Sequence, residues 1–394
     1  MNHAYLATVL DLSLPLGAGQ RAAQALGHGV SAALRILEES PHLRLEVALA
    51  GAVTLALLRW GEERSLQLLA ERAAAGQVSF LNTACFGAFL PLIPEREASR
   101  QLDLCERVNR DALGQGVYRP EGLFPPQLGY SRSVAELSFR RGYGRVLADG
   151  LSWHGGAPLP RARHFTLRDK PELDVFFVDR ALSEAIAQGP PMAEIRHRVA
   201  PRVPGGAVVR LPSHALLDDG VALRFLEALA ASDAVLPASL EDLLALFPER
   251  EPVEPLASAL GTDPVELASG VQFAKWSAPG NELHALLWRL AQIAAGEAAR
   301  LEETGAEEAP PGLTSLRARL DESLDCSAWR FASGKPDLAR VGEGGRRLLE
   351  TILAGGADVR PSALAQAEHT WARLERRLAE VALEPAGAHT PHAP

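Results

Sequence analysis

Polar side chains that could bind or transform a ligand follow or border several short apolar runs of the sequence. They are hydroxyls, amides, carboxylates and one imidazole, at Ser13, Ser79, Asn82, Gln127, Asp149, Asp179, His214 and Asp218. In a parallel α/β barrel the reacting groups lie at the carboxyl ends of the strands. This placement predicts one site at the mouth of such a barrel, where amides and hydroxyls bind a polar ligand and carboxylates or the imidazole move protons.

The charged members of this set have alternative interpretations. His214 is a candidate acid/base because an imidazole titrates near neutrality, but a histidine at a strand end also serves as a structural hydrogen-bonding group. Asp218 and Asp219 are adjacent, so they cannot both face one pocket, and carboxylates also suit the N-terminal end of the helix expected over residues 220–232. Asp179 precedes Arg180 and could form an internal ion pair with it.

The strands that would position these groups are indicated by apolar runs rich in branched residues. They cover residues 7–14, 43–51, 78–82, 122–126, 144–149, 174–179, 206–212 and 233–239, and amphipathic helical patterns such as 22–40 and 131–143 lie between them. Such alternation indicates a parallel sheet covered by helices. Seven or eight repeats favour closure, so we expect an α/β protein with a parallel (β/α) barrel of about seven strands.

The chain changes character after about residue 255. The strand pattern stops, and amphipathic helices are expected at 280–303, 312–324, 343–355 and 361–383. We therefore expect a barrel over residues 1–255 and a C-terminal helical bundle over 256–383. Residues 384–394 have too few large apolar side chains to fold, so a disordered tail is expected there.

The composition argues against several classes of function. The 40 basic and 49 acidic residues give a formal charge of -9 without a basic stripe, so nucleic acid is not an expected partner. Cys85, Cys105 and Cys326 are far apart and form no CxxC pair, which argues against a disulfide framework and a zinc site and favours a reducing compartment. No metal is expected.

The sequence also lacks motifs for binding a nucleotide cofactor and segments for crossing a membrane. Residues 15–20 contain glycines without the spacing of a nucleotide-binding loop, so no cofactor is expected. The longest uncharged apolar run, 47–58, is too short to span a bilayer. Residues 1–17 lack the basic start and cleavage site of a signal peptide, and we expect a cytoplasmic protein without a membrane partner.

A resemblance to a known family is carried by the order of several short segments. They are DLSLP (11–15), GQVSFL (76–81), TACFGAFLPLIP (83–94), RPEGLFPPQ (119–127), GYGRVLADG (142–150), FFVDRALS (176–183), RLPSHALLDDG (210–220), NELHALLWRL (281–290) and LDCSAWRFASGKP (324–336). In this order they resemble the motifs of glycoside hydrolase family 57 over about residues 5–350. The resemblance implies a barrel of the glycoside hydrolase/deacetylase type and a role in carbohydrate metabolism.

The chain departs from that family where the resemblance places its catalytic groups. Two histidines are exchanged for Asp11 and Ser13, a glutamate for Ser79 and a further histidine for Ala84. The nucleophilic glutamate falls on Gln127. The catalytic aspartate falls near Pro212, which Ser213 and His214 follow. Framework residues remain: Gly76, Pro91, Pro120, Gly122, Pro126, Gly142, Asp149, Asp179 and Arg180.

These exchanges decide the expected chemistry. Retaining glycosidases need two carboxyl groups about 5 to 5.5 Å apart, and an amide at Gln127 has neither the charge to attack nor a titratable proton to deliver. We therefore expect a degenerate relative that binds an α-glucan or related saccharide or assists a partner enzyme. Two alternatives stay open. One is an active α-glucan hydrolase or 4-α-glucanotransferase that uses relocated residues such as Asp218, His214 or Asp179, and the other is a structural or interaction protein.

The expected pocket combines neutral hydrogen-bonding groups with aromatic faces on which sugar rings could stack. Trp153, in the loop LSWHGGAPLP, and Trp329 are the candidates for such faces. The full expected lining is Asp11, Ser13, Ser79, Ala84, Gln127, Asp149, Trp153, Asp179, His214, Asp218 and Trp329.

Overall fold

The computed structural model describes residues 3–15, 17–201, 203–217, 220–303 and 311–383. The chain divides into two compact units, one up to Leu260 and one from Gly261 onward. The sequence places this boundary at residue 255. The tail expected over 384–394 and the candidate Asp218 lie outside the described residues.

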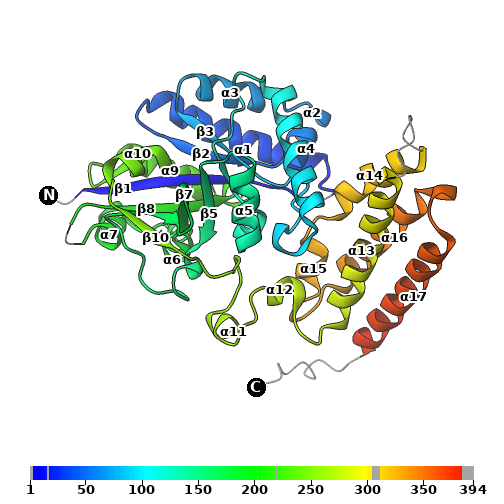
Figure 1. Cartoon of the computed structure of the whole chain (residues 1–394). Coiled ribbons are helices and arrows are strands. Elements are labelled where there is room, and N and C mark those ends of the chain that lie inside the picture. The colour runs from blue at the N-terminus through cyan, green and yellow to red at the C-terminus, as the bar shows by residue number, and fades with distance from the viewer. Residues whose placement is uncertain (1–2, 16, 202, 218–219, 304–310, 384–394) are drawn as a thin grey trace. The chain divides into compact units, whose positions relative to one another are not determined.

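Seven parallel strands form a closed barrel in the first unit (Figure 1). Around the ring they are β1 (Ala4–Leu12), β2 (Leu45–Leu49), β3 (Val78–Asn82), β4 (Gly122–Leu123), β5 (Arg145–Asp149), β7 (Lys170–Val178) and β8 (Gly205–Pro212). β8 pairs with β1 along eight residues, Ala4 to Asp11, and closes the ring. The prediction of a parallel (β/α) barrel of about seven strands is confirmed.

Three further strands lie outside the ring. β9 (Val235–Ala238) pairs with the first half of β1, β6 (His164–Leu167) runs antiparallel to β7, and β10 (Arg250–Val253) runs parallel to β6. The apolar run at 233–239 is therefore a strand, but not a member of the barrel. β6 and β10 were not expected, because four residues of mixed polarity, HFTL and REPV, carry no clear period.

Helices of the first unit lie between the strands along the chain. They are α1 (Gln20–Glu39), α2 (Gly51–Arg59), α3 (Glu63–Ala74), α4 (Glu95–Leu113), α5 (Arg132–Arg140), α6 (Arg180–Ile186), α7 (Met192–Val199), α8 (His214–Leu217), α9 (Val221–Ala230) and α10 (Leu240–Leu246). The short 3₁₀ turns η1 (Leu90–Leu92), η2 (Pro126–Leu128) and η3 (Gly150–Ser152) follow β3, β4 and β5.

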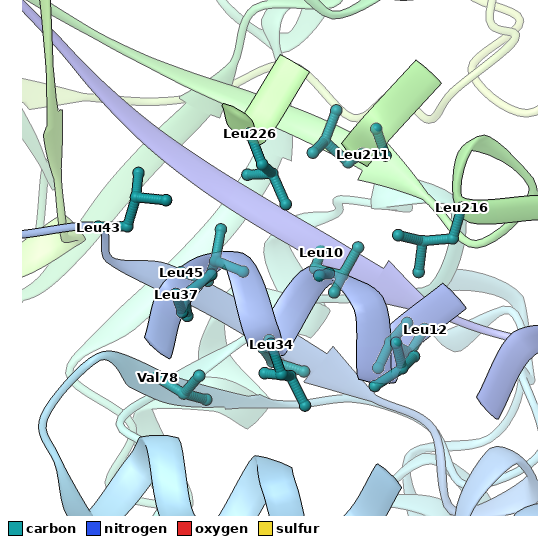
Figure 2. Close-up of a cluster of buried hydrophobic side chains, with 14 of the residues drawn as sticks. Leu10, Leu12, Leu34, Leu37, Leu43, Leu45, Val78, Leu211, Leu216 and Leu226 are labelled. Carbon is teal, nitrogen blue, oxygen red and sulfur yellow. The ribbon is translucent and has the colours of Figure 1, made fainter. Parts of the chain in front are cut away.

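Two apolar clusters, one on each side of the strands, hold the barrel together. Leu10 and Leu12 of β1 lie in the outer cluster with Leu34 and Leu37 of α1 (Figure 2). Val9, which precedes Leu10, belongs to the inner cluster. Because successive side chains point to opposite faces, a strand buried on both sides is apolar at nearly every position. Truncating one such leucine to alanine costs about 2 to 5 kcal/mol.

The second unit is helical. Its helices are α11 (Pro264–Ala268), α12 (Ala274–Ser277), α13 (Glu282–Glu303), α14 (Pro311–Ser323), α15 (Ser327–Phe331), α16 (Leu338–Leu353) and α17 (Pro361–Leu383), with η4 (Gly356–Asp358). α13, α16 and α17 pack against one another, and α14 packs against α13 and α16. Among the described residues no helix is both long and apolar enough to cross a membrane. Cys85, Cys105 and Cys326 are buried, and none of them is disulfide-bonded.

A buried histidine ties three helices of this unit together. The Nδ1 atom of His284 on α13 accepts a hydrogen bond from the Ala278 amide at 3.0 Å. The proton is therefore on Nε2, which lies 2.9 Å from the Trp329 carbonyl of α15 and donates to it. Burial lowers the pKa of His284 below its usual value of 6.5, since the charged ring would lose its hydration.

Replacing His284 by alanine should lower the free energy of unfolding by about 3 kcal/mol, because an amide and a carbonyl lose their buried partner. The wild type should also lose stability as the pH falls below 6.5, since the unfolded chain then binds a proton that the folded chain rejects. This loss is at most about 1.4 kcal/mol per pH unit for one group, and the variant should lack it.

Urea unfolding at pH 7.5 and pH 5.5 measures both effects. The matched control is His369→Ala, which removes an exposed histidine on α17. An equal fall in stability between the two pH values in wild type and His284→Ala would contradict the assignment.

Candidate functional site

The mouth of the barrel is formed by the carboxyl ends of the seven strands, which parallel strands place at one rim. Asp11 of β1 lies at this rim, paired in register with Ala48 of β2 and Pro212 of β8. Asp149 is the last residue of β5, and Arg180 follows β7. Carboxylates and a guanidinium group therefore lie together at the rim.

On the β1–β8 side, Asp11 is held by Arg210. The Nε and Nη2 atoms of Arg210 donate to Asp11 Oδ2 at 2.8 and 2.5 Å. Beyond the strands, the Ser213 hydroxyl donates to the Asp11 carbonyl at 2.9 Å and accepts from the Ser13 amide at 2.7 Å. Asp11, Ser13 and Pro212 are thus brought together at the ends of β1 and β8.

On the β5–β7 side, Asp149 is fully buried and bound by Arg180. The Nε of Arg180 lies 3.2 and 3.1 Å from the two carboxylate oxygens, and Nη2 donates to Oδ2 at 2.5 Å. Asp149 Oδ1 also accepts from the Leu151 amide at 2.9 Å. With both oxygens occupied and no exposed surface, this carboxylate cannot reach a ligand.

Asp179 has a different partner from the one its neighbour suggests. It caps α6 by accepting from the Leu182 amide at 2.9 Å, and it pairs with Arg161. The Asp179–Arg180 ion pair considered from the sequence is therefore wrong, because Arg180 turns to Asp149. The sequence neighbour was the wrong partner because the Asp179 side chain accepts from an amide in the first turn of α6, as a helix cap does, whereas the Arg180 side chain extends to Asp149.

Gln127 occupies a strained turn after β4. Its backbone is left-handed, with φ 59° and ψ 21°, and Leu128 follows with φ 49°. Non-glycine residues rarely adopt this region, at a cost of about 1 to 3 kcal/mol each, and they cluster at functional sites where the surroundings impose the conformation. Leu128 is buried in the inner cluster, which supplies one such constraint.

A second constraint is a segment that we call the strap, residues 256–260. The Leu260 amide donates to the Gln127 carbonyl at 2.7 Å, and Ser258 exchanges backbone hydrogen bonds of 2.9 and 3.2 Å with Tyr130. Arg180 Nη2 donates to the Ala259 carbonyl at 3.0 Å. The strap therefore links the ends of β4 and β7 and, through Arg180, the buried Asp149.

One of the expected neutral groups lies away from the mouth, and the side chain of another is bound to neighbouring elements. Ser79 is the second residue of β3 and pairs with Glu46, so it lies near the start of the strand and not at the mouth. Asn82 is fully buried, and its Nδ2 donates to the Tyr143 hydroxyl at 2.6 Å and the Leu102 carbonyl at 3.2 Å. It ties β3 to α4. The placement of Ser79 differs from the expected lining. Ala84 is buried just after β3.

The two tryptophans are not exposed platforms. Trp153 is 7% exposed, with its ring 4.8 Å from Phe165 and 5.7 Å from Phe177. Trp329 belongs to the second unit and is 1% exposed, with its ring 4.4 Å from Trp288. Exposure of Trp153 was expected because polar and glycine residues flank it in the sequence. In the structure, Phe165 and Phe177 pack against its ring.

The remaining candidates follow β8. Pro212 ends the strand and is half-buried, and His214 begins α8 with an exposed side chain. Asp218 is not among the described residues. Within the described ranges no three or more histidine, cysteine, aspartate or glutamate side chains are grouped to hold a metal ion.

The sequence argument missed Arg210 and the strap. Arg210 could have been found, because a guanidinium inside the apolar run GAVVRLP must have a buried partner. It lies two residues from Val208, a member of the inner cluster, and so faces the interior of the barrel. The strap carries no local signal, since its bonds are made to residues about 80 to 130 positions away.

Comparison with known proteins agrees with this geometry. Residues 30–188 match the model of the family described as Glycosyl hydrolase family 57. This match includes Gln127, Asp149 and Arg180 but neither Asp11 nor Pro212. No curated protein sequence matches the chain.

Solved structures share the fold at low sequence identity. The 4-alpha-glucanotransferase from Thermococcus litoralis has a TM-score of 0.71 at 13% identity, over 91% of this chain and 60% of its own length. The GH57-type branching enzyme from Pyrococcus horikoshii has 0.66 at 13%, over 96% and 94%. The alpha-amylase AmyC from Thermotoga maritima has 0.61 at 13%, over 94% and 97%. The chain thus spans three fifths of the glucanotransferase.

The fold therefore defines a parallel (β/α) barrel protein with a helical C-terminal unit. Residues 30–188, less than half of the chain, are similar to glycosyl hydrolase family 57, and the fold is similar to that of the solved structures named above.

Replacing Arg180 by methionine should destabilise the protein by about 3 to 5 kcal/mol, because the buried Asp149 carboxylate loses its counter-charge. The double variant Asp149→Asn/Arg180→Met should recover much of this loss, since no charge is then buried alone. The control Arg198→Met breaks an exposed pair with Glu194 and should cost less than about 0.5 kcal/mol. Urea unfolding provides the measurement, and equal losses in the single and double variants would contradict the prediction.

Proposed function

We propose that the barrel mouth binds an α-glucan or a related saccharide and does not cleave it by the retaining mechanism. The observation that carries the proposal is Gln127, an amide on a strained and strapped turn at the end of β4. The resemblance puts the family's nucleophilic glutamate at this residue, and the family match includes it. On this turn the side chain that the backbone holds is a neutral amide.

The acids near Gln127 do not replace it. Asp149 is enclosed by Arg180 and the Leu151 amide, and two of its hydrogen bonds would have to break before it met a substrate. Asp11 is bound through Oδ2 by Arg210. Retention needs a nucleophile and a separate acid/base at close range. The proposal therefore favours binding over turnover by these groups.

A saccharide as the ligand is supported by the relatives. The proteins of similar fold are named a 4-alpha-glucanotransferase, a branching enzyme and an alpha-amylase. A further branching enzyme, from Thermococcus kodakaraensis, was solved in complex with glucose. We extend the proposal to an accessory role beside a partner enzyme in the cytoplasm, where three cysteines without disulfide bonds would stay reduced.

Purified protein should release no reducing ends from maltoheptaose or glycogen. The variant Gln127→Glu should also stay inactive, because one carboxyl group is insufficient for retention. Reducing-end assays after repeated purification test both. Turnover that disappears in Asp11→Asn or Asp218→Asn would overturn the proposal and favour an enzyme with relocated catalytic groups.

Maltoheptaose should bind weakly, with a dissociation constant of about 10 μM to 10 mM, or roughly 3 to 7 kcal/mol. Gln127→Gly should reduce the affinity at least tenfold while leaving the fold intact, since glycine accepts the positive φ without strain. Calorimetry measures the binding, and Gln67→Ala on α3 is the control amide outside the mouth. Absence of heat with maltoheptaose, glycogen and a β-glucan would favour the structural or interaction alternative.

A further inference from the structure

A groove runs between α13 and α17 in the helical unit. The two helices pack side by side (Figure 1). Glu282 pairs with Arg373 at one end of the groove and Arg289 bonds to Gln366 at the other, so the helices run in opposite directions. The groove has a volume of about 540 Å³, which is in the usual range for sites that bind small molecules.

Small side chains leave the middle of this groove open. Ala285 on α13 and Ala365 on α17 line it and are exposed, and the buried Leu286 lines it as well. The stretch of α13 from Glu282 to Arg289 is about 10 Å long, at 1.5 Å per residue. The groove can therefore hold an elongated molecule of about this length, with a polar group at each end and an apolar wall between them.

The polar groups that the groove leaves for a ligand are mainly donors. Arg289 Nη2 donates to Gln366 Oε1 at 3.2 Å, so the other guanidinium N–H groups and the NH₂ of the Gln366 amide stay available. Glu282, the carboxylate of the lining, already has a cation at each oxygen. Its Oε1 accepts from Arg373 at 2.8 Å, and its Oε2 lies 3.9 Å from Arg377. The ligand that satisfies this lining must therefore supply acceptors.

The lining also carries more positive than negative charge. Within the described ranges, the partner of Arg289 is a neutral amide, whereas Arg373 is balanced by Glu282. His369 lines the groove too and adds a charge when it is protonated. The net charge is thus about +1 to +2, and a phosphate monoester carries about −1.5 to −2 at pH 7. A guanidinium group also matches the spacing of phosphate oxygens with two parallel hydrogen bonds.

We infer that the groove between α13 and α17 binds a small phosphate monoester of the size of a hexose phosphate. The phosphate oxygens accept from Arg289 and from the Gln366 amide, which the hydrogen bond between these side chains holds together. The body of the ester lies along Ala285 and Ala365. All of these residues belong to the second unit, so this site is separate from the barrel mouth.

The test is titration of the full chain, labelled with ¹⁵N-arginine, with glucose 6-phosphate at pH 7.5. The Nε–H resonances of Arg289 and Arg373, each identified by its loss on substitution, should move saturably, with sodium chloride at equal ionic strength giving no such change. Glucose should not move them, because it lacks the anionic group. Inorganic phosphate should bind at least threefold more weakly, because it leaves the middle of the groove empty. A response to glucose or to inorganic phosphate as strong as that to glucose 6-phosphate would overturn the inference.

Two variants, followed at the Arg373 resonance, locate the site. Arg289→Gln removes the charge from an exposed position and should weaken glucose 6-phosphate binding at least tenfold. The matched control Arg346→Gln, which removes an exposed arginine paired with Glu350 on α16, should leave it unchanged. Ala285→Leu fills the middle of the groove and should weaken the ester at least fivefold while sparing inorganic phosphate. Urea unfolding checks that both variants keep their fold, and unchanged affinity for the ester in either folded variant would overturn the inference.

Discussion

The pairing of β1 with β8 is the contact on which the rest of the barrel depends. Residues about 200 positions apart meet along Ala4–Asp11 and Gly205–Pro212, and the sheet becomes a ring. Closure satisfies the strand edges and encloses an inner face. It also brings Asp11 beside Arg210 and lets the Ser213 hydroxyl continue the pairing beyond the last strand residue.

Closure places charged groups in a confined mouth, and their pairing sets what the mouth can do. A buried carboxylate is tolerated only with a counter-charge and further hydrogen bonds. Arg180 supplies the counter-charge of Asp149, and Arg210 supplies that of Asp11. The arginines that make these acids tolerable also occupy the oxygens that a reaction would use. Gln127 is neutral, in contrast to these two ion pairs. Its backbone is held in place by the strap and by the buried Leu128.

The two sides of β8 differ in strength. Toward β1 the pairing is long, and toward β7 it is a single position. On the β7 side, other elements add hydrogen bonds. β6 and β10 extend the sheet beyond β7, and the Gly206 amide donates to the Arg161 carbonyl. Gly206 is needed there, since a Cβ would meet Leu243 and Phe247 at 2.8 Å.

The sequence by itself determined the elements and their order, because apolar periods of two and of three to four residues are local properties. The eight strand runs, α1, α5 and the long C-terminal helices are all present, and Gln127 follows its strand as expected. The tertiary structure decided how far along its strand each residue lies relative to the mouth, and which distant side chain it contacts. Ser79 lies near the start of β3 because register is set by pairing with Glu46, and Arg180 turns to Asp149 across 31 positions. Trp153 is buried by Phe165 and Phe177, whose approach depends on the folding of β6 onto β7. Such contacts join residues distant in the chain, so no local pattern encodes them.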